Sequence, residues 1–214
     1  MKINKRYLFF SLWMLAAFLC WTAAAMLFDV QPVGPRGSFV GLAAVNQFVH
    51  RQTGVHMFWY EITDYLSIVP LGIAAGFALT GLKQLICRKH LAKVDRSILI
   101  LGGFYMVVMA VYVLFELLVV NYRPVLIDNI LEPSYPSSTT VLVLCVMSTA
   151  RLQFDARVQN QTFKRWIGRA ITVFNIFMVG GRLFSGVHWC SDIIGGVLLS
   201  IGLVWLYRAF CDAT

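Results

Sequence analysis

The sequence predicts an all-α, polytopic membrane protein with six transmembrane helices, organised as a single domain over residues 1–214. Hydrophobic residues make up 59% of the chain and charged residues 13%, whereas soluble domains average about 45–50% and about 25%. Mean hydropathy is +0.73. No polar linker marks off a second module, so one membrane domain is expected.

Apolar runs of about 20 residues are long enough to cross a bilayer as helices. Five runs stand out, at about 7–28, 61–82, 97–120, 167–187 and 191–210, and a sixth, at about 138–153, is shorter and reaches Arg151. The first run exceeds the usual ~7–15 apolar residues of a signal peptide. An uncleaved helix is therefore favoured, with Ala23–Ala25 as the small-residue run that cleavage would use.

The placement of basic residues favours six spans with both termini in the cytoplasm. All of the 18 Lys and Arg residues then lie on the cytoplasmic side except Arg36, Arg51, Arg123 and Arg182, as the positive-inside rule expects. Without the 138–153 span, the basic loop at 155–165 would lie outside. The formal charge of +8 is therefore typical of membrane topology, and no nucleic-acid partner is expected.

Two outer segments differ from the spans. Residues 29–60 begin with turn residues and end in the aromatic stretch Met57–Tyr60, which predicts a loop with a surface helix near the interface. Residues 121–138 contain three prolines, so a long continuous helix is excluded there.

Polar residues that could form a site occur at three places on the outer side of the predicted spans. Arg123 and Pro124 come after the third span, Pro136 to Thr139 start the fourth, and Arg182-x5-His188-x3-Asp192 joins the fifth to the sixth. Ionisable residues at membrane depth are functional candidates because they are costly to keep there. Each motif alone is weak, but the three can converge on one side.

The residue types suit a phosphate. Arg123 and Arg182 can hold phosphate oxygens in a bidentate manner. Ser137 and Ser138 stand at a helix start, where free N–H groups favour an anion.

His188 can attack phosphorus as a neutral imidazole. Asp192 lies four residues later, on the same helical face, where it could accept the other ring proton and fix the tautomer. No metal and no cofactor is expected, because no carboxylate or zinc-ligand cluster occurs.

At these residues the chain resembles the type-2 phosphatidic acid phosphatase and vanadium haloperoxidase superfamily. The motifs of its membrane branch are Lys-x6-Arg-Pro, Pro-Ser-Gly-His and Ser-Arg-x5-His-x3-Asp. The third is the best matched, as Gly181-Arg182-x5-His188-x3-Asp192, with Gly181 in place of the Ser.

The resemblance implies an integral membrane lipid phosphatase, that is, a phosphoric ester hydrolase acting on a phosphorylated or diphosphorylated lipid at the extracytoplasmic face. His188 would form a phosphohistidine, Asp192 would orient it, and Arg123, Arg182 and Ser137 with the neighbouring backbone amides would hold the phosphate. Membrane lipids are the other expected partners, and the sequence does not indicate an oligomeric state.

Two departures affect the first two motifs. Glu116 stands where the Lys is expected, and Ser138-Thr139 replace the Gly-His whose histidine protonates the leaving group. A threonine hydroxyl is too weak an acid for that task near neutral pH, which favours a lipid diphosphate, whose leaving group needs less protonation. Glu116 could donate the proton itself, or it could pair with Arg123 or Arg182, and the ion pair is favoured.

His50 and His56 are further outer-side candidates for the proton donor. The departures also keep two other functions open. One is a catalytically silent homologue that binds or translocates phosphorylated lipids. The other is phosphotransfer to an acceptor hydroxyl in place of water.

Overall fold

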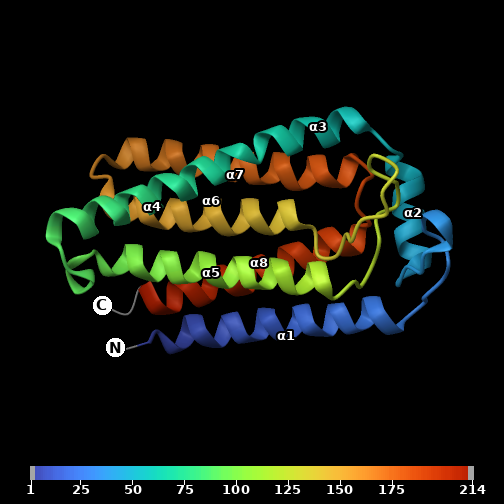
Figure 1. Ribbon diagram of the computed structural model, residues 1–214, viewed down its shortest axis with the longest axis horizontal. Coiled ribbons are helices and arrows are strands. Elements are labelled where there is room, and N and C mark those ends of the chain that lie inside the picture. Colours follow the sequence, from blue (N-terminus) through green and yellow to red (C-terminus); the bar gives the residue numbers. More distant parts are fainter. Residues whose placement is uncertain (1–2, 212–214) are drawn as a thin grey trace.

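A computed structural model describes residues 3–211 as a bundle of helices (Figure 1). Its α-helices are α1 (Lys5–Leu27), α2 (Ala43–Thr53), α3 (Met57–Leu66), α4 (Ile68–Arg88), α5 (Arg96–Leu117), α6 (Ser138–Arg157), α7 (Gln161–Phe184) and α8 (Cys190–Cys211). Two 3-10 turns, Pro35–Gly37 and Leu91–Lys93, lie in connecting loops. Over residues 3–211 the β-pairing is confined to isolated bridges, so the predicted all-α class is confirmed. Lys2, one of the residues assigned to the cytoplasm, lies outside the described range.

Five segments are long and apolar enough to cross a membrane: Lys5–Leu27, Met57–Arg88, Arg96–Leu117, Gln161–Phe184 and Cys190–Cys211. The second joins α3 and α4, which are separated at Ser67, and so extends beyond the predicted 61–82 at both ends. Large apolar side chains such as Phe9 and Leu117 point outward from these segments, as expected where the surroundings are lipid rather than water. The chain is a multi-pass membrane protein.

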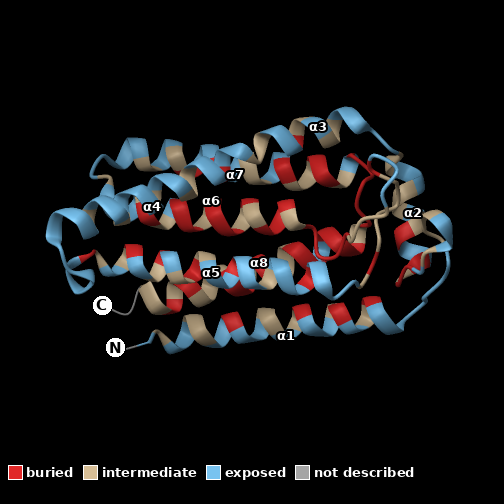
Figure 2. Cartoon of the chain, in the orientation of Figure 1, coloured by how far each residue is buried: buried red, intermediate tan, exposed pale blue. Residues whose placement is uncertain are grey.

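The sixth predicted span, α6, lies at the centre of the bundle. It contacts α4, α5, α7 and α8, and buried residues run along most of its length (Figure 2). Because protein rather than lipid surrounds it, it can carry polar residues, and Thr149 Oγ1 donates to Cys145 O at 2.8 Å. The polar residues made the apolar run look shorter in the sequence than the helix is, because the helix continues to Arg157.

α8 packs closely against α1 at the side of the bundle. Gly202 allows this approach, because a Cβ there would lie 2.7 Å from Leu15 Cδ2. Ser11 Oγ also donates to Gly202 O at 2.8 Å. The first and last helices therefore pack against each other, and α1 helps to position α8 in the bundle.

The two termini lie at one end of the bundle, together with the α4–α5 and α6–α7 connections (Figure 1). The opposite end holds α2, the loop that follows α5 and the α7–α8 connection. As expected, residues 29–56 form loops and a short helix, α2, and residues 121–137 contain no helix. The aromatic stretch Met57–Tyr60, expected in the outer segment, instead forms the first turn of α3. The predicted site residues all belong to this second end or to the helix turns beside it.

Candidate active site

Three segments that are far apart in the sequence meet at the end of the bundle opposite the termini. The predicted residues are distributed over the loop after α5 (Arg123), the start of α6 (Ser137, Ser138, Thr139), the last turn of α7 (Arg182), the α7–α8 connection (His188) and the first turn of α8 (Asp192).

His188 is buried, with 3% of its surface exposed. Its Nε2 lies 3.3 Å from Arg123 Nη1, so this nitrogen faces the guanidinium of the loop after α5. An imidazole nitrogen beside an arginine is well placed to share an anion with it. The fold thus brings together two residues that are 65 positions apart in the sequence.

The turn that carries His188 depends on a glycine and on the α2–α3 loop. Gly186 has φ +67, and a Cβ there would lie 2.0 Å from Gly54 O. His56 N donates to Ser185 O at 2.9 Å, and His50 Nε2 lies 3.1 Å from Gly186 O. Only glycine meets both demands, since it combines a positive φ with the absence of a side chain.

Asp192 is fully buried and lies one helical turn after His188. Its Oδ2 is 3.7 Å from His188 Nδ1, which is too long for a hydrogen bond. The carboxylate instead accepts from Trp189 N at 3.0 Å and from Asn121 Nδ2 at 3.1 Å. Asp192 thus holds the backbone next to His188 and leaves the ring nitrogen within ion-pair range.

The surroundings of His188 favour its neutral form. Burial lowers the pKa of His188 to about 4, and the charges of Arg123 and Arg182 act in the same direction, while Asp192 opposes them. A charged imidazolium is disfavoured away from water and beside other cations. At neutral pH the imidazole therefore keeps a free lone pair.

Arg182 is buried at the end of α7, 2% exposed. Its Nη2 donates to Asp64 Oδ1 at 3.2 Å and to Thr139 Oγ1, and its guanidinium stacks over Tyr60 with 5.0 Å to the ring centre. Nε and Nη1 are buried without a hydrogen-bond partner in the part of the chain that the structure describes. Two donors left unpaired in this way are costly unless a ligand accepts from them.

Arg123 has a second contact besides His188. Its Nε lies 2.9 Å from Glu132 Oε2, and its backbone N–H donates to Glu132 O at 3.0 Å. The loop after α5 therefore carries its own counterion for the arginine. The carboxylates of Glu132 and Asp64 are both partly exposed, at 37% and 57% of their side chains.

The three residues at the start of α6 have different surroundings. Ser137 is the N-cap, and its Oγ accepts from Thr140 N and Thr140 Oγ1 at 3.5 and 3.0 Å. Its own N–H donates to Asp192 O at 3.1 Å, which ties α6 to α8. Ser138 and Thr139 line the pocket beside His188, where the N–H groups of a first helical turn lack partners within the helix.

Glu116 lies in the last turn of α5 and lines the same pocket as His188. The expected ion pair with Arg123 or Arg182 does not form. Each arginine pairs with another carboxylate, Glu132 or Asp64, because these lie on the loop and helix next to it. Glu116 therefore faces the pocket without a cationic partner among the described residues.

His50 and His56, the other candidates for a proton donor, stand behind the α7–α8 connection. His50 packs against Trp189, with ring centres 5.3 Å apart, and His56 precedes α3. Neither residue is among those that line the pocket. Their place in the fold is structural, next to the turn that carries His188.

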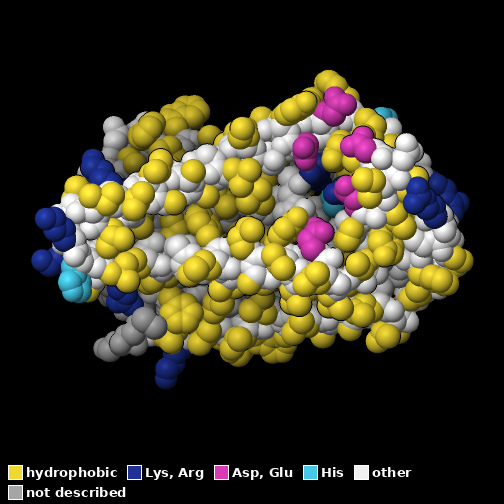
Figure 3. All heavy atoms as spheres, viewed as in Figure 1, with side chains coloured by type: hydrophobic (Ala, Val, Ile, Leu, Met, Phe, Trp, Pro, Cys, Tyr) yellow, Lys and Arg dark blue, Asp and Glu magenta, His cyan; other side chains and the backbone are white. Residues whose placement is uncertain are grey.

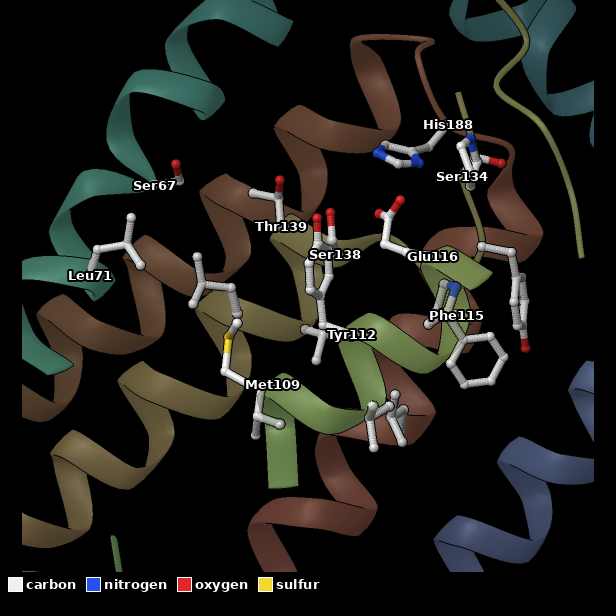
Figure 4. A pocket seen from close by; sticks show the side chains of 18 residues that line it. Ser67, Leu71, Met109, Tyr112, Phe115, Glu116, Ser134, Ser138, Thr139 and His188 are labelled. Carbon is white, nitrogen blue, oxygen red and sulfur yellow. The ribbon is translucent and has the colours of Figure 1, made fainter. Parts of the chain in front are cut away.

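The pocket itself has a polar head and an apolar body. It encloses about 230 Å³, and Glu116, Ser138, Thr139 and His188 lie at its head (Figure 4). Apolar residues of α4, α5 and α6, such as Leu71, Met109 and Leu142, line the rest. In Figure 3, basic and histidine atoms are visible at the base of the hollow and acidic side chains surround it.

Several residues of the site carried no signal in the sequence. Asn121 is fully buried, and it accepts from Gly41 N at 3.2 Å while donating to Asp192. Asn46 accepts from Ser191 N at 3.1 Å. Only the position of Asn121 directly before the Tyr-Arg-Pro stretch could have drawn attention to it. No cluster of three His, Cys, Asp or Glu suited to a metal occurs in residues 3–211.

Comparisons with known proteins agree with this geometry. The family model of the PAP2 superfamily matches residues 72–213. A crystal structure described as the first transmembrane PAP2 type phosphatidylglycerolphosphate phosphatase, from Bacillus subtilis, is similar in fold. It has a TM-score of 0.62 and 15% sequence identity, over 94% of this chain and 96% of that chain. No curated protein matches this chain in sequence.

The matched range takes in α5 through α8 and therefore Arg123, the start of α6 and the Arg182 to Asp192 segment. The residues that converge in space therefore lie within the matched range. The chain belongs to the PAP2 superfamily.

Proposed function

We propose that the protein is an integral membrane lipid phosphatase in which His188 Nε2 attacks the phosphorus of a phosphorylated lipid. One observation carries this proposal: a buried imidazole lies at the head of an apolar pocket, and its Nε2 is 3.3 Å from the guanidinium of Arg123. The imidazole supplies the nucleophile, and the pocket supplies a place for a hydrocarbon chain.

The phosphate would be held by the two arginines and the start of α6. Arg182 Nε and Nη1 are donors without partners among the described residues, and Arg123 Nη1 is next to the nucleophile. Together with the N–H groups of Ser138 and Thr139, they would stabilise the charge that develops on the phosphoryl oxygens. Attack by His188 would give a phosphohistidine, which water then hydrolyses.

The substrate class follows from the pocket and from the family. The walls below the polar head are formed by side chains such as Leu71 and Val108, which suit an acyl or prenyl chain better than a soluble phosphate ester. The similar Bacillus subtilis structure is of a phosphatidylglycerolphosphate phosphatase. We therefore include phosphatidylglycerolphosphate in the substrates to be tested, beside phosphatidic acid and lipid diphosphates.

The active site would lie on the extracytoplasmic side. It is at the end of the bundle opposite the termini (Figure 1). Near the termini, the α4–α5 connection carries Lys89 and Lys93, and Arg157 and Lys164 lie in the turns of α6 and α7 that adjoin the α6–α7 connection. Basic loops favour the cytoplasm. A substrate would then be presented from the outer leaflet.

The test is phosphate release by the purified protein from a panel of lipid mono- and diphosphates. We expect His188→Ala to reduce release to background for every substrate, because the nucleophile is lost. Labelled substrate should leave an acid-labile, base-stable phosphoryl group on the native protein and none on His188→Ala. His90→Ala, at the opposite end of the bundle, is the matched control and should retain full activity.

A second candidate function is a silent homologue that binds phosphorylated lipids. The ion pairs of Arg123 with Glu132 and of Arg182 with Asp64 favour it, because these carboxylates compete with a phosphate. Binding of a lipid phosphate without any release or label would select this function. Transfer of the labelled phosphoryl group to an added alcohol would instead indicate a phosphotransferase.

A further inference from the structure

The pocket offers few groups that could protonate a leaving oxygen. Of the described residues that line it, those with an ionisable side chain are Tyr112, Glu116, Tyr135 and His188. The hydroxyl of Tyr135 is engaged with Thr22 Oγ1 at 2.7 Å, and His188 is the nucleophile of the proposed reaction. Tyr112 and Glu116 remain, one helical turn apart on α5.

Thr139, which stands where a histidine is expected, is committed to another contact. Its Oγ1 accepts from Arg182 Nη2, so the hydroxyl helps to hold the buried guanidinium. A hydroxyl is also a poor proton donor near neutral pH. The substitution at Thr139 thus leaves a positioning contact in place of an acid.

Glu116 is directed toward the reacting region. In Figure 4 its carboxylate points to the same space as the imidazole of His188 and the hydroxyl of Ser138. Tyr112 lies one turn before it on α5 and lines the same pocket. Helical residues at this spacing are neighbours, so the tyrosine can orient the carboxyl group.

The charged side chains near Glu116 are already matched with one another. The two arginines are each matched by a carboxylate, Glu132 or Asp64, and Asp192 is buried beside His188. A phosphate anion that enters this site adds negative charge near the carboxyl group of Glu116. A carboxyl group that carries its proton can donate a hydrogen bond to an oxygen of the substrate.

From these observations we infer that Glu116 is the proton donor to the leaving oxygen, a catalytic role that rests on the proposed phosphatase function. In the first step the lone pair of His188 Nε2 forms a bond to phosphorus. The bond from phosphorus to the lipid oxygen breaks, and its electron pair stays on that oxygen. The carboxyl group of Glu116 gives its proton to the oxygen, so a neutral lipid alcohol leaves and a carboxylate remains.

The second step restores the site. The carboxylate of Glu116 takes a proton from the attacking water as its oxygen bonds to phosphorus. The bond from phosphorus to Nε2 breaks, and its electron pair returns to the imidazole. Inorganic phosphate is released, Glu116 is protonated again, and no oxidant or co-reactant is needed.

This role changes the expected substrate range. The replacement of histidine by Thr139 alone favours diphosphates, whose leaving phosphate needs little protonation. With Glu116 as donor, a lipid monophosphate with an alkoxide leaving group is also cleaved. Phosphatidic acid is therefore expected to be a substrate of the native protein.

The test compares two leaving groups in Glu116→Gln, which keeps the shape of the side chain and cannot donate its proton. We expect kcat on phosphatidic acid to fall by about 10²–10⁴-fold, the usual contribution of a general acid. Hydrolysis of nitrophenyl phosphate, whose leaving group needs no proton, should change by less than about threefold, which is small compared with the loss expected on phosphatidic acid. Glu61→Gln, an exposed change of the same type on α3 at the same end, should alter neither rate.

A second measurement tests whether the nucleophile still works in the variant. Glu116→Gln should still form the phosphohistidine label from nitrophenyl phosphate.

Several outcomes would overturn the inference. These are an equal loss of kcat on both substrates or no loss on either. A third is a loss of kcat that depends on whether the lipid head group carries a positive charge and not on the leaving group. The last would make Glu116 an ammonium-binding residue. If the native protein neither releases phosphate nor becomes labelled on His188, the proposed phosphatase function itself fails. The two failures are thereby distinguished.

Discussion

A buried histidine serves as a nucleophile only if its imidazole is neutral and one ring nitrogen faces the electrophile. His188 meets both conditions through different neighbours. Burial and the two arginines favour the neutral form. Asp192 accepts a hydrogen bond from the backbone N–H of Trp189, which holds the chain turn that carries the imidazole. The arginines that would hold the phosphate are thus the same groups that keep the nucleophile free of a proton.

The lowered pKa of His188 predicts the acid side of the pH profile. Because the pKa is about 4, the imidazole remains a nucleophile above that pH and is protonated below it. Turnover of nitrophenyl phosphate should therefore persist from neutral pH down to about pH 4–5. Asp192 raises this pKa, so in Asp192→Asn the acid limb should shift to still lower pH.

The comparison of the two profiles cancels the substrate's own titration near pH 6. An acid limb near the ordinary histidine value of about 6.5, unchanged in Asp192→Asn, would contradict this prediction. It would mean that His188 is exposed to water in the working enzyme.

The sequence allowed the chemically specific residues of the site to be predicted, but not their supports. Arg182, His188 and Asp192 stand out because charged residues are rare in an apolar tail. Asn46 and Asn121 are equally buried, yet an asparagine in a loop or short helix has many ordinary uses. Asp64 and Glu132 became visible only in three dimensions, since Asp64 pairs with Arg182 from another helix and Glu132 pairs with Arg123 across the loop after α5.

Among the elements, α6 shows why hydropathy alone underestimates a central helix. Its neighbours are α4, α5, α7 and α8, so its side chains meet protein, and threonine and glutamine are accommodated by internal hydrogen bonds. The apolar helices around it are easily found because they face lipid. The prediction of a sixth helix depended on the charges of the 155–165 loop, and its full length to Arg157 was not visible in the pattern.

The contact between α3 and α7 explains the glycine that replaces a serine in the third motif. A Cβ at Gly181 would lie 2.6 Å from Thr63 Cγ2. Thr63 is fully buried, and its Oγ1 donates to Trp59 O at 2.8 Å, so it has little room to move. The glycine therefore lets α3, which carries Asp64, approach the turn that carries Arg182.

Gly181→Ser is expected to destabilise the protein by about 1–3 kcal/mol, the usual cost of overpacking, and to weaken the contact of Arg182 with Asp64. Thr63→Ser removes the clashing methyl group and keeps the hydroxyl. The double variant should therefore recover most of the thermal stability lost in Gly181→Ser, as measured in detergent or nanodiscs. Purely additive losses in the double variant would show that the two side chains do not meet.

At the scale of the whole molecule, charge and chemistry are separated along the bundle axis. The termini, the basic α4–α5 connection and the basic helix turns beside the α6–α7 connection occupy one end, and the candidate site occupies the other (Figure 1). The pocket opens among α4, α5 and α6 below the polar head, so a lipid could keep its chain in the apolar part while its phosphate reaches His188. This arrangement is consistent with the proposed place of the site at the extracytoplasmic rim of the bilayer.

Cysteine labelling tests that orientation directly. Two proteins with a single cysteine each are compared, all other cysteines being replaced by serine. The first carries Gln52→Cys on the exposed face of α2 and should react with a membrane-impermeant maleimide in intact cells. The second keeps the native Cys87, exposed near the end of α4 at the opposite end of the bundle, and should react only after the membrane is permeabilised. The reverse pattern would place the phosphate site in the cytoplasm, and labelling of both positions in intact cells would mean a mixed orientation. Retained phosphatase activity in each labelled variant ensures that the folded protein is being measured.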